Sequence, residues 1–315
     1  MEKMKALVYD KKGSPEKLIY QDVEKPAPTD NEVLIKILVV SVNAADYRSM
    51  KMGIIPKRKI FGADITGTVV SAGKNIRKFK NGDEVIGDLS GYGFGGFAEY
   101  TVAPEKALVQ KPANLSSEEA AALPLAGITA LQALRNIGNI QKGQKVLIVG
   151  SGGGVGTYAV QLAKYFGAEV TAVCSTKNLK QTISLGADYV IDYTKEDFTR
   201  GNRYYDLILA VNGNHPLSAY RRILNRNGLY VMVGGALLQI FRSILFGRLM
   251  SFGSKKMRTL MAKSNQKDLA FIVKLAEDGK IKPVIDRRYS LDKAADAMRY
   301  LSEGHARGKV VITVE

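Results

Sequence analysis

The sequence predicts an α/β protein with a β-rich part followed by a doubly wound parallel-sheet part. Two observations predict this. Residues 1–115 contain short segments rich in β-branched side chains, separated by Gly, Pro and Asn-Gly, which is typical of a sandwich or barrel. From Lys145 onward, apolar runs of four to six residues alternate with helical patterns, and this alternation indicates a parallel sheet with helices on both faces.

In the β-rich part, the pattern predicts six strands and then a helix. Ser116 and Glu119 have the spacing of a capping box, which marks the start of an alanine-rich helix. The expected strands are 4–10, 18–24, 32–42, 65–73, 83–89 and 97–103.

The second part is expected to alternate strands and helices, and the chain end adds two further helices. The expected strands are 145–149, 168–174, 188–193, 206–211 and 228–234, and the expected helices are 154–167, 176–186 and 216–224. At the chain end, we expect a helix over 267–280, a strand over 283–290, a helix over 291–304 and a strand over 309–315, in this order.

Composition and charge limit the function classes. The chain has 315 residues, 46% apolar and 24% charged, which is an ordinary globular balance for about two domains. One cysteine excludes an intrachain disulfide, and with two histidines it leaves almost no ligands for a Cys/His zinc site. The net charge of +16 predicts attraction to an anionic partner such as phosphate, nucleic acid or a lipid surface.

No targeting or membrane-spanning segment is expected. The start lacks the apolar stretch of a signal peptide, and no uncharged apolar run reaches the ~18 residues that a spanning helix needs. We therefore expect a cytoplasmic protein that is at most peripheral to a membrane.

The segment 236–264 fits neither pattern, because it is apolar and basic without an acidic residue. The acid-free stretch extends over 207–267 and holds ten Lys and Arg residues, so the positive charge is concentrated there. Three interpretations stay open: a dimer or domain interface, a lid over an apolar substrate pocket, or weak contact with an anionic membrane surface.

The run KVLIVGSGGGVGTYAVQLAK places a glycine-rich turn between a buried strand and a helix. Such a turn lets the backbone approach a pyrophosphate, whose charge is stabilised by the helix N-terminus. The strict G-x-G-x-x-G does not fit, because Ser151 stands in the first position. The strand–helix alternation that follows nevertheless favours a dinucleotide site over a structural turn.

The end of the following strand bears on the choice of cofactor. An NAD site usually has an acidic residue ~20 residues after the glycines, whereas this chain has Ser175, Thr176 and Lys177 there. A hydroxyl and an ammonium suit a 2′-phosphate, so NADPH is predicted over NADH. A helix cap formed by Ser175 or Thr176 is compatible with the same function.

Several motifs in order resemble the quinone oxidoreductase branch of the medium-chain dehydrogenase/reductase superfamily. They are GGGVGTYAVQLAKYFGAEVTAVCSTKN, LGADYVIDYTKEDF, and the sequences of 42–53, 61–87, 95–112 and 279–315. The resemblance implies a GroES-like catalytic domain over 1–120, a Rossmann NADPH-binding domain over 121–264, and a return to the catalytic domain over 265–315. It also makes a homodimer the expected assembly.

The resemblance implies a cofactor-binding role for residues at the matching positions. Gly153, Gly154, Val155 and Gly156 would lie at the pyrophosphate, and Ser175, Lys177 and Tyr193 would surround the 2′-phosphate and adenosine. Thr129, Val211, Asn212, Gly234 and Gly235 would lie near the nicotinamide, and Lys309 and Asn43 are also expected at the cofactor.

The departures from the superfamily concern zinc. Its zinc alcohol dehydrogenases have Cys in place of Asn43 and Gly-His-Glu in place of Gly62-Ala63-Asp64. Without these ligands, zinc cannot polarise a carbonyl here, so no metal site is predicted. The expected reaction is hydride transfer from NADPH to acceptors that are already electrophilic, namely quinones and α,β-unsaturated carbonyls.

Two residues are candidates for handling the proton or the developing charge. Tyr47 is a potential proton donor, and Asn43 would either donate to an oxyanion or hold the nicotinamide ribose. Protonation by solvent is an equal alternative to Tyr47. The alternative function is a basic binding protein for RNA or membranes with a retained cofactor site, although the chain has no RNA-binding motif and specific nucleic acid binding is not expected.

Overall fold

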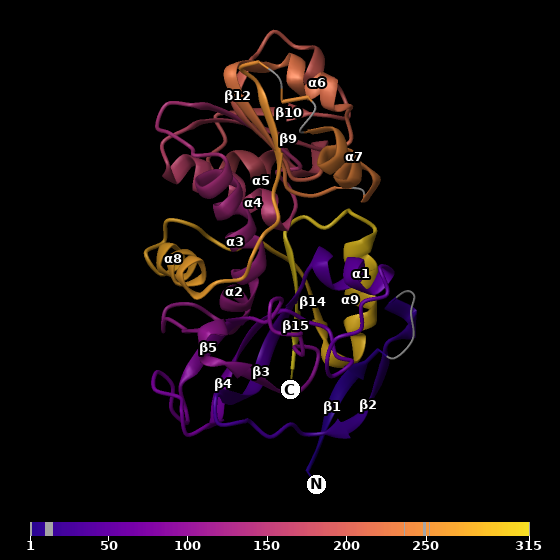
Figure 1. Ribbon diagram of the computed structural model, residues 1–315, viewed down its shortest axis with the longest axis vertical. Helices are drawn as coiled ribbons and strands as arrows, with labels where there is room; N and C mark the ends of the chain where they lie inside the picture. The colour runs from indigo at the N-terminus through magenta and orange to yellow at the C-terminus, as the bar shows by residue number, and fades with distance from the viewer. Residues whose placement is uncertain (1, 10–14, 236, 248–249, 252, 315) are drawn as a thin grey trace. The chain divides into compact units, whose positions relative to one another are not determined.

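The computed structural model describes residues 2–9, 15–235, 237–247, 250–251 and 253–314. The chain forms two compact units. The first unit comprises Met1–Ile128 and Lys263–Glu315, and the second comprises Thr129–Ala262. Each unit has its own sheet (Figure 1), and the α/β prediction is confirmed.

The first unit contains a seven-stranded sheet to which both ends of the chain contribute. Its strand order is β14-β15-β3-β4-β5-β7, and β6 also pairs with β3. A separate antiparallel pair is formed by β1 (Lys3–Val8) and β2 (Ile19–Glu24). The sheet strands are β3 (Glu32–Val42), β4 (Asp64–Ala72), β5 (Glu84–Asp88), β6 (Tyr100–Pro104), β7 (Leu108–Gln110), β14 (Ile285–Ser290) and β15 (Lys309–Thr313).

The strand β3 forms the centre of this sheet because it is almost continuously apolar. Ile35 and Ile37 are fully buried, and β3 pairs antiparallel with β15, β4 and β6. The pairing of β15 with β3 brings the last strand of the chain beside Asn43 and its neighbours. The helices of this unit are α1 (Ala44–Lys51), α2 (Ser117–Ala122), α8 (Gln266–Glu277) and α9 (Ala294–Ser302), and α3 (Pro124–Leu131) crosses into the second unit.

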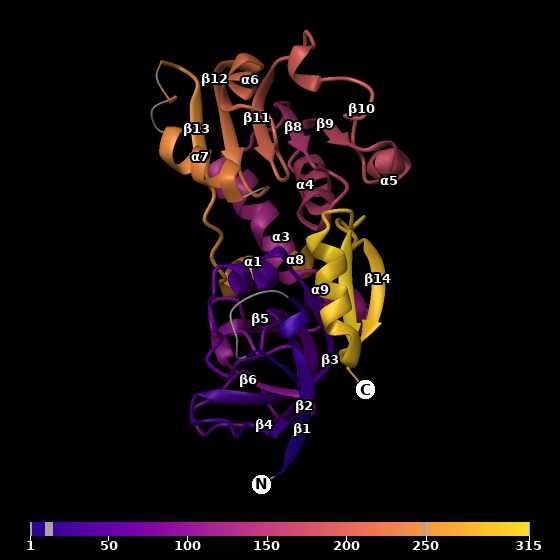
Figure 2. The ribbon, with the colours of Figure 1, turned by 90° about the vertical axis from the view of Figure 1, so that its right-hand side faces the viewer.

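The second unit is a parallel sheet of six strands in the order β10-β9-β8-β11-β12-β13 (Figure 2). The order reverses direction between β8 and β11, which is the doubly wound arrangement that the sequence predicts. The strands are β8 (Lys145–Val149), β9 (Glu169–Cys174), β10 (Tyr189–Asp192), β11 (Tyr205–Ala210), β12 (Leu224–Met232) and β13 (Lys256–Thr259). The helices are α4 (Gly154–Tyr165), α5 (Leu179–Ser184), α6 (Leu217–Arg222) and α7 (Leu237–Gly247).

Several elements were not among those expected, including the short strand β7. The edge strand β13 has the sequence Lys-Met-Arg-Thr, in which a single apolar residue gives no strand pattern, and its pairing with β12 makes it a strand. Residues 44–51 form a helix, α1, where the sequence pattern indicated no element. Part of the segment 236–264, which the sequence pattern left unassigned, falls outside the described residues at 236, 248–249 and 252.

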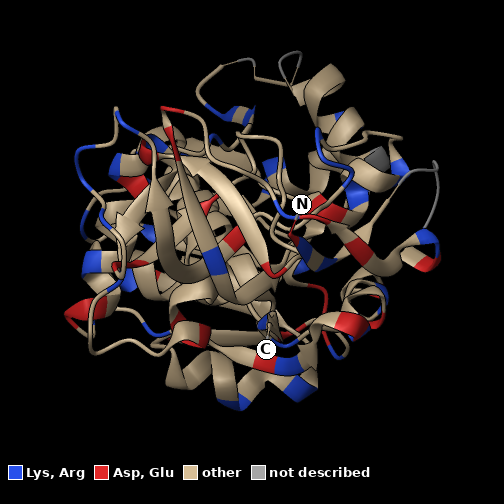
Figure 3. Ribbon diagram, turned by 90° about the horizontal axis from the view of Figure 1, so that it is seen from below, with Lys and Arg blue, Asp and Glu red and all other residues tan. Residues whose placement is uncertain are grey.

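The charge is divided unequally between the units. Residues 129–262 hold 17 Lys and Arg against 6 Asp and Glu, whereas the remainder holds 29 against 24. Figure 3 shows both signs mixed among the strands and loops around the two chain ends, which belong to the first unit. Across the part of the chain that is described, no helix is long and apolar enough to cross a membrane.

Candidate cofactor site and buried polar cluster

The glycine-rich turn joins β8 to α4 in the second unit. Gly150 has a φ of +89°, which only glycine adopts without strain. The amides of Gly150 and Ser151 both donate to the carbonyl oxygen of Val173, at 3.0 Å each. The turn is thereby fixed to the end of the neighbouring strand β9.

Two glycines of this turn have opposite surroundings. A Cβ added at Gly156 would lie 2.1 Å from the carbonyl oxygen of Gly150, so α4 approaches the turn closely only because residue 156 is glycine. A Cβ added at Gly153 would meet nothing nearer than this same oxygen, at 4.0 Å. The turn is therefore packed on the side of Gly156 and open on the side of Gly153.

Gly153 caps the N-terminus of α4 with an extended backbone. The first helical hydrogen bond runs from the amide of Thr157 to the carbonyl of Gly153, and the N–H groups of the first turn have no acceptor within the helix. An open cradle beside these N–H groups fits the pyrophosphate of a dinucleotide. Gly154 and Val155 lie in this first turn and are partly exposed.

The residues predicted around the adenosine lie at the ends of β9 and β10. Ser175 follows β9 directly, and Lys177 is exposed two residues later. The amide of Tyr193 donates to the carbonyl of Cys174 at 3.1 Å, which holds Tyr193 beside the end of β9 with an exposed ring. The structure therefore brings these three residues to the same edge of the sheet as the glycine turn.

The nicotinamide-side residues of the second unit gather at the same edge. The amides of Val211 and Asn212 donate to the carbonyl of Val149, at 3.0 and 3.1 Å. The amide of Gly234 donates to the carbonyl of Ala210 at 3.2 Å, so the end of β12 lies beside the end of β11. Gly235 follows with a φ of +133°, and Thr129 lies half-buried in α3.

One acidic residue at this edge was missed by the sequence reasoning. Asp192, the last residue of β10, accepts hydrogen bonds from the hydroxyls of Thr176 and Thr194 and from the amide of Thr194. These bonds, that of Thr176 first, lower the pKa of Asp192. The sequence does show Asp192 at the end of β10, the third strand of this unit. A ribose-binding acid usually lies at the end of the second strand, which is β9 here.

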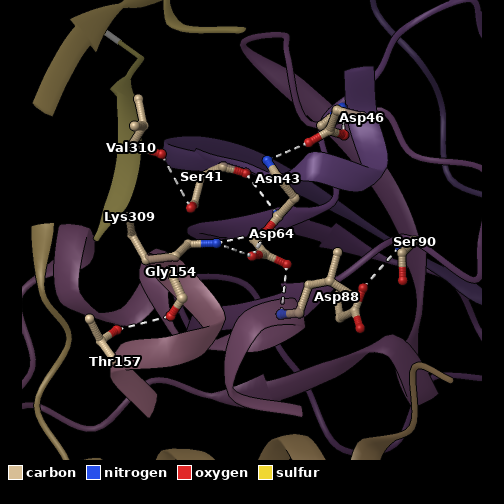
Figure 4. Close-up of polar contacts among 12 residues, drawn as sticks. Ser41, Asn43, Asp46, Asp64, Asp88, Ser90, Gly154, Thr157, Lys309 and Val310 are labelled. Carbon is tan, nitrogen blue, oxygen red and sulfur yellow. Dashed lines mark hydrogen bonds and ion pairs between the residues drawn. The ribbon is translucent and has the colours of Figure 1, made fainter. Parts of the chain in front are cut away.

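In the first unit, a buried polar cluster surrounds Asn43, which precedes α1 (Figure 4). The ammonium of Lys309 donates to Asn43 Oδ1 at 2.6 Å and lies 3.2 Å from Asp64 Oδ2. Asn43 Nδ2 donates to Asp64 Oδ2 at 2.8 Å and to the carbonyl of Ser41 at 3.2 Å. Lys309 is only 3% exposed and Asp64 is fully buried, so this is a desolvated ion pair bridged by an amide.

The network fixes which way the amide of Asn43 points. Turning it over would place its NH2 group against the ammonium of Lys309 and its oxygen against the carboxylate of Asp64. In the observed orientation both N–H groups have acceptors, and Oδ1 accepts from the ammonium of Lys309. Asn43 therefore has no N–H group left to donate to an oxyanion, and its carbonyl oxygen is the atom with which it could bind a ligand hydroxyl.

Asp46 holds the start of α1 against the β4 side of the unit. Its carboxylate accepts from the amide of Asn43 at 2.8 Å and from that of Gly62 at 3.1 Å. Complete burial nevertheless raises its pKa to about 7. These bonds to the backbone hold the segment that carries Asn43 and Tyr47.

The buried carboxyl groups of Asp64 and Asp88 belong to neighbouring strands, β4 and β5. Asp64 pairs with Asp88 across the strands. Burial raises the pKa of Asp64 to about 6, although Lys309 opposes this rise. Its Oδ1 accepts from the amide of Leu125 at 3.0 Å, while Asp88 Oδ2 has no hydrogen-bond partner among the described residues.

Tyr47 lies on α1, four residues after Asn43. Its ring is half-buried and packs against the core of the first unit. The ammonium of Lys51 lies 5.6 Å from the ring centre, and the guanidinium of Arg48 lies 5.8 Å from it. The role of Tyr47 as a proton donor stays a prediction.

The donors in this cluster do not fit a catalytic zinc ion. Position 43 supplies an amide, position 63 a methyl group, and position 64 a carboxylate that is already paired with an ammonium. A buried ammonium 3.2 Å from that carboxylate would repel a divalent cation. Cys174, which ends β9, is buried in the other unit, and the described residues contain no group of three or more His, Cys, Asp or Glu side chains that could hold a metal.

Two families of dehydrogenase domains match this chain. Residues 29–113 match the family described as "Alcohol dehydrogenase GroES-like domain", and residues 185–312 match that described as "Zinc-binding dehydrogenase". The second match contains none of the positions 43, 63 and 64.

Individual relatives are similar over the whole chain. The chain is 36% identical to a chloroplast envelope quinone oxidoreductase homolog of Arabidopsis thaliana, with 98% of each chain covered. It is 33% identical to an NADPH-dependent alkenal/one oxidoreductase of the same plant, over 98% of this chain and 79% of that one. Among solved structures, the quinone oxidoreductase of Coxiella burnetii matches with a TM-score of 0.89 and 30% identity over the full length of both chains.

Proposed function

The chain belongs to the quinone oxidoreductase branch of the medium-chain dehydrogenase/reductase superfamily, and from this premise we propose that it transfers hydride from NADPH to quinones or α,β-unsaturated carbonyls without zinc. Membership confirms the predicted fold class, a GroES-like β-rich domain plus a Rossmann parallel-sheet domain, and makes the protein an NAD(P)H-dependent oxidoreductase. The observation that carries the zinc-free proposal is the ammonium of Lys309 between Asn43 and Asp64.

The second unit would bind the cofactor. Gly153, Gly154, Val155 and Gly156 receive the pyrophosphate at the open side of the turn, where the N-terminus of α4 stabilises its charge. When bound, the cofactor supplies the hydride, and the protein supplies its orientation. Val211, Asn212, Gly234 and Gly235 at the ends of β11 and β12, together with Thr129, hold the nicotinamide end.

The specific choice of NADPH rests on Ser175 and Lys177. Lys177→Glu is expected to raise the dissociation constant for NADPH at least about tenfold, because a carboxylate replaces an ammonium beside the 2′-phosphate. The dissociation constant for NADH should change less than about threefold. Titration of cofactor fluorescence measures both constants.

The exposed Lys180 on α5 offers a matched control, since it lies three residues further along the same surface. Lys180→Glu makes the same charge change and should leave the preference for NADPH in place. Equal losses of NADPH and NADH affinity in Lys177→Glu would remove Lys177 from the phosphate site.

In the first unit, we propose that Asn43 accepts a hydrogen bond from a nicotinamide ribose hydroxyl through Oδ1, since both of its N–H groups already have acceptors. Lys309 then acts on the cofactor through Asn43, as a positioning residue that holds the amide. This assignment favours the ribose role over the oxyanion role for Asn43. Tyr47, or solvent, provides the proton to the reduced product.

The absence of a fitting zinc site limits the substrate class. Without a Lewis acid, an unactivated carbonyl or alcohol lacks the polarisation that its reaction requires. Quinones and enones are electrophilic without such help. The proposal is tested by NADPH oxidation with these acceptors in the presence of a metal chelator.

The assembly and location belong to the same proposal. A homodimer has an expected mass of twice 34.3 kDa, which light scattering after gel filtration measures directly. We propose a cytoplasmic location.

A further inference from the structure

The helix α7 (Leu237–Gly247) faces its own unit with small and polar side chains. Gln239 Nε2 donates to the carbonyl of His215 at 2.7 Å, and the hydroxyls of Ser243 and Thr259 are 2.9 Å apart. A Cβ added at Gly247 would lie 3.8 Å from the carbonyl of Met257. Residues 239, 243 and 247 are spaced by four, so they form one stripe along the helix that packs on β13.

Four large apolar side chains of α7 are exposed, whereas Ile240 is partly buried against the core of the second unit. Phe241 is 63% exposed and Leu245 is 66% exposed, and Ile244 and Phe246 are exposed as well. A surface helix of a globular protein normally has the opposite arrangement, with its apolar stripe on the core. A contiguous exposed apolar patch of this kind marks an interaction surface.

Positive groups surround the C-terminal end of this helix. Arg242 is exposed on α7 itself. Lys255 Nζ donates to the carbonyl of Arg221 at 3.0 Å, and Arg221 Nε donates to the carbonyl of Met250 at 3.3 Å. Lys256 Nζ binds the carbonyl of Gly253 at 3.1 Å. Three cations, from α6, from the loop after α7 and from the start of β13, thus lie close to the chain segment that follows α7.

Acidic groups are scarce around the same face. Residues 207–267 contain none. The carbonyl of His215 accepts from Gln239, and Nδ1 of the same histidine is 4.0 Å from the Oδ1 atom of Asp197. The other oxygen of this carboxylate is 3.2 Å from Nε of Arg200. The negative charge of Asp197 is thus already paired with the guanidinium of Arg200.

We propose that the exposed face of α7 (Phe241, Ile244, Leu245 and Phe246) docks on the surface of an anionic lipid bilayer. The helix would lie in the interface, with its apolar side chains inserted and its basic end at the headgroups. Eleven residues are enough for this, and far too few to span a bilayer.

Charge distinguishes this occupant from a second copy of the chain. A two-fold symmetric dimer would bring the same surface of each copy together. Two acid-free basic faces repel each other, whereas an anionic bilayer attracts them. The proposal does not depend on which acceptor the enzyme reduces.

Vesicle co-sedimentation of the full chain tests the proposal. The probes are vesicles of phosphatidylcholine alone and of phosphatidylcholine with 30% phosphatidylglycerol. We expect binding to the anionic vesicles and at least about fivefold weaker binding to the neutral ones. Leu245→Ser should weaken binding on the order of tenfold, and Arg242→Gln about fivefold.

Ile183→Ser is the matched control, because Ile183 on α5 of the same unit is 58% exposed. This variant should bind anionic vesicles like the wild type. Thermal unfolding of all variants checks that the fold is retained.

Three outcomes would overturn the proposal. They are no binding to anionic vesicles, equal binding to both vesicle types, and binding by Leu245→Ser equal to that of the wild type. A dimer that dissociates in Leu245→Ser, in a protein that ignores vesicles, would instead assign this face to contact between copies.

Discussion

Lys309→Met is expected to lower the free energy of unfolding by about 3–5 kcal/mol at pH 8, because it removes the cation from a buried ion pair. Asp64 would be left fully buried, with the amide of Asn43 as its remaining partner in the cluster. The same change frees Asn43 Oδ1 from its donor, so the amide is no longer held in one orientation. Urea unfolding followed by circular dichroism measures the stability.

The loss should depend on pH with a definite sign. The pKa of Asp64 is raised to about 6 in the folded protein. Below this pH the folded protein holds Asp64 protonated, and a neutral carboxyl group loses less when Lys309 is removed. The difference in stability between wild type and Lys309→Met is therefore expected to be smaller at pH 5 than at pH 8.

Lys274→Met on α8 makes the same substitution in an exposed ion pair with Glu277 and Asp278. Exposed pairs contribute little to stability, so this variant should unfold like the wild type. A Lys309→Met protein as stable as Lys274→Met at pH 8 would show that the cluster is not a desolvated ion pair.

Gly153→Ala is expected to raise the dissociation constant for NADPH at least about tenfold while leaving the free energy of unfolding within about 0.5 kcal/mol of wild type. The added methyl group has no protein atom nearer than 4.0 Å, so the folded chain accommodates it. It would project into the open side of the turn, where the pyrophosphate is expected. Affinity and stability should thus separate.

Gly156→Ala adds the same methyl group three residues later and should behave differently. The new Cβ would lie 2.1 Å from the carbonyl of Gly150, so the turn or α4 must move at a cost of about 1–3 kcal/mol. Both stability and NADPH affinity should fall. If Gly153→Ala binds NADPH as tightly as the wild type, the open side of the turn does not receive the pyrophosphate.

Much of the fold can be predicted from local sequence patterns. The predicted strand 32–42 has the bounds of β3, because eight of its eleven residues are apolar and β-branched or leucine. The glycine turn is equally readable, since a strand, a turn and a helix follow one another within one short segment. These features depend on contacts between residues that are close in sequence.

The buried cluster could not be predicted in this way. Lys309 and Asn43 are 266 residues apart in sequence and meet because β15 pairs with β3. The resemblance placed both residues at the cofactor, but neither pattern nor spacing shows that they bind each other. The helix α1 was missed although Asp46 stabilises its start through a local bond from the amide of Asn43, and only the bond from Gly62 comes from a more distant part of the sequence.

The orientation of α7 shows a second limit of sequence patterns. The apolar and basic composition of 236–264 left three interpretations open, and a helical pattern alone implies that the large apolar residues face the core. In the structure, hydrogen bonds from Gln239 and Ser243 turn the other stripe inward. Polar contacts with His215 and Thr259, which the pattern does not contain, decide the orientation.

The activity that we propose is hydride transfer from NADPH to an activated acceptor without a metal. The most direct test follows NADPH oxidation at 340 nm with a quinone, a lipid-derived enone and a simple aldehyde, with and without EDTA, and with NADH in parallel. We predict turnover of the quinone or the enone that prefers NADPH and is unchanged by EDTA. Loss of turnover with EDTA, or reduction of the aldehyde alone, would show that the enzyme does not work in this way.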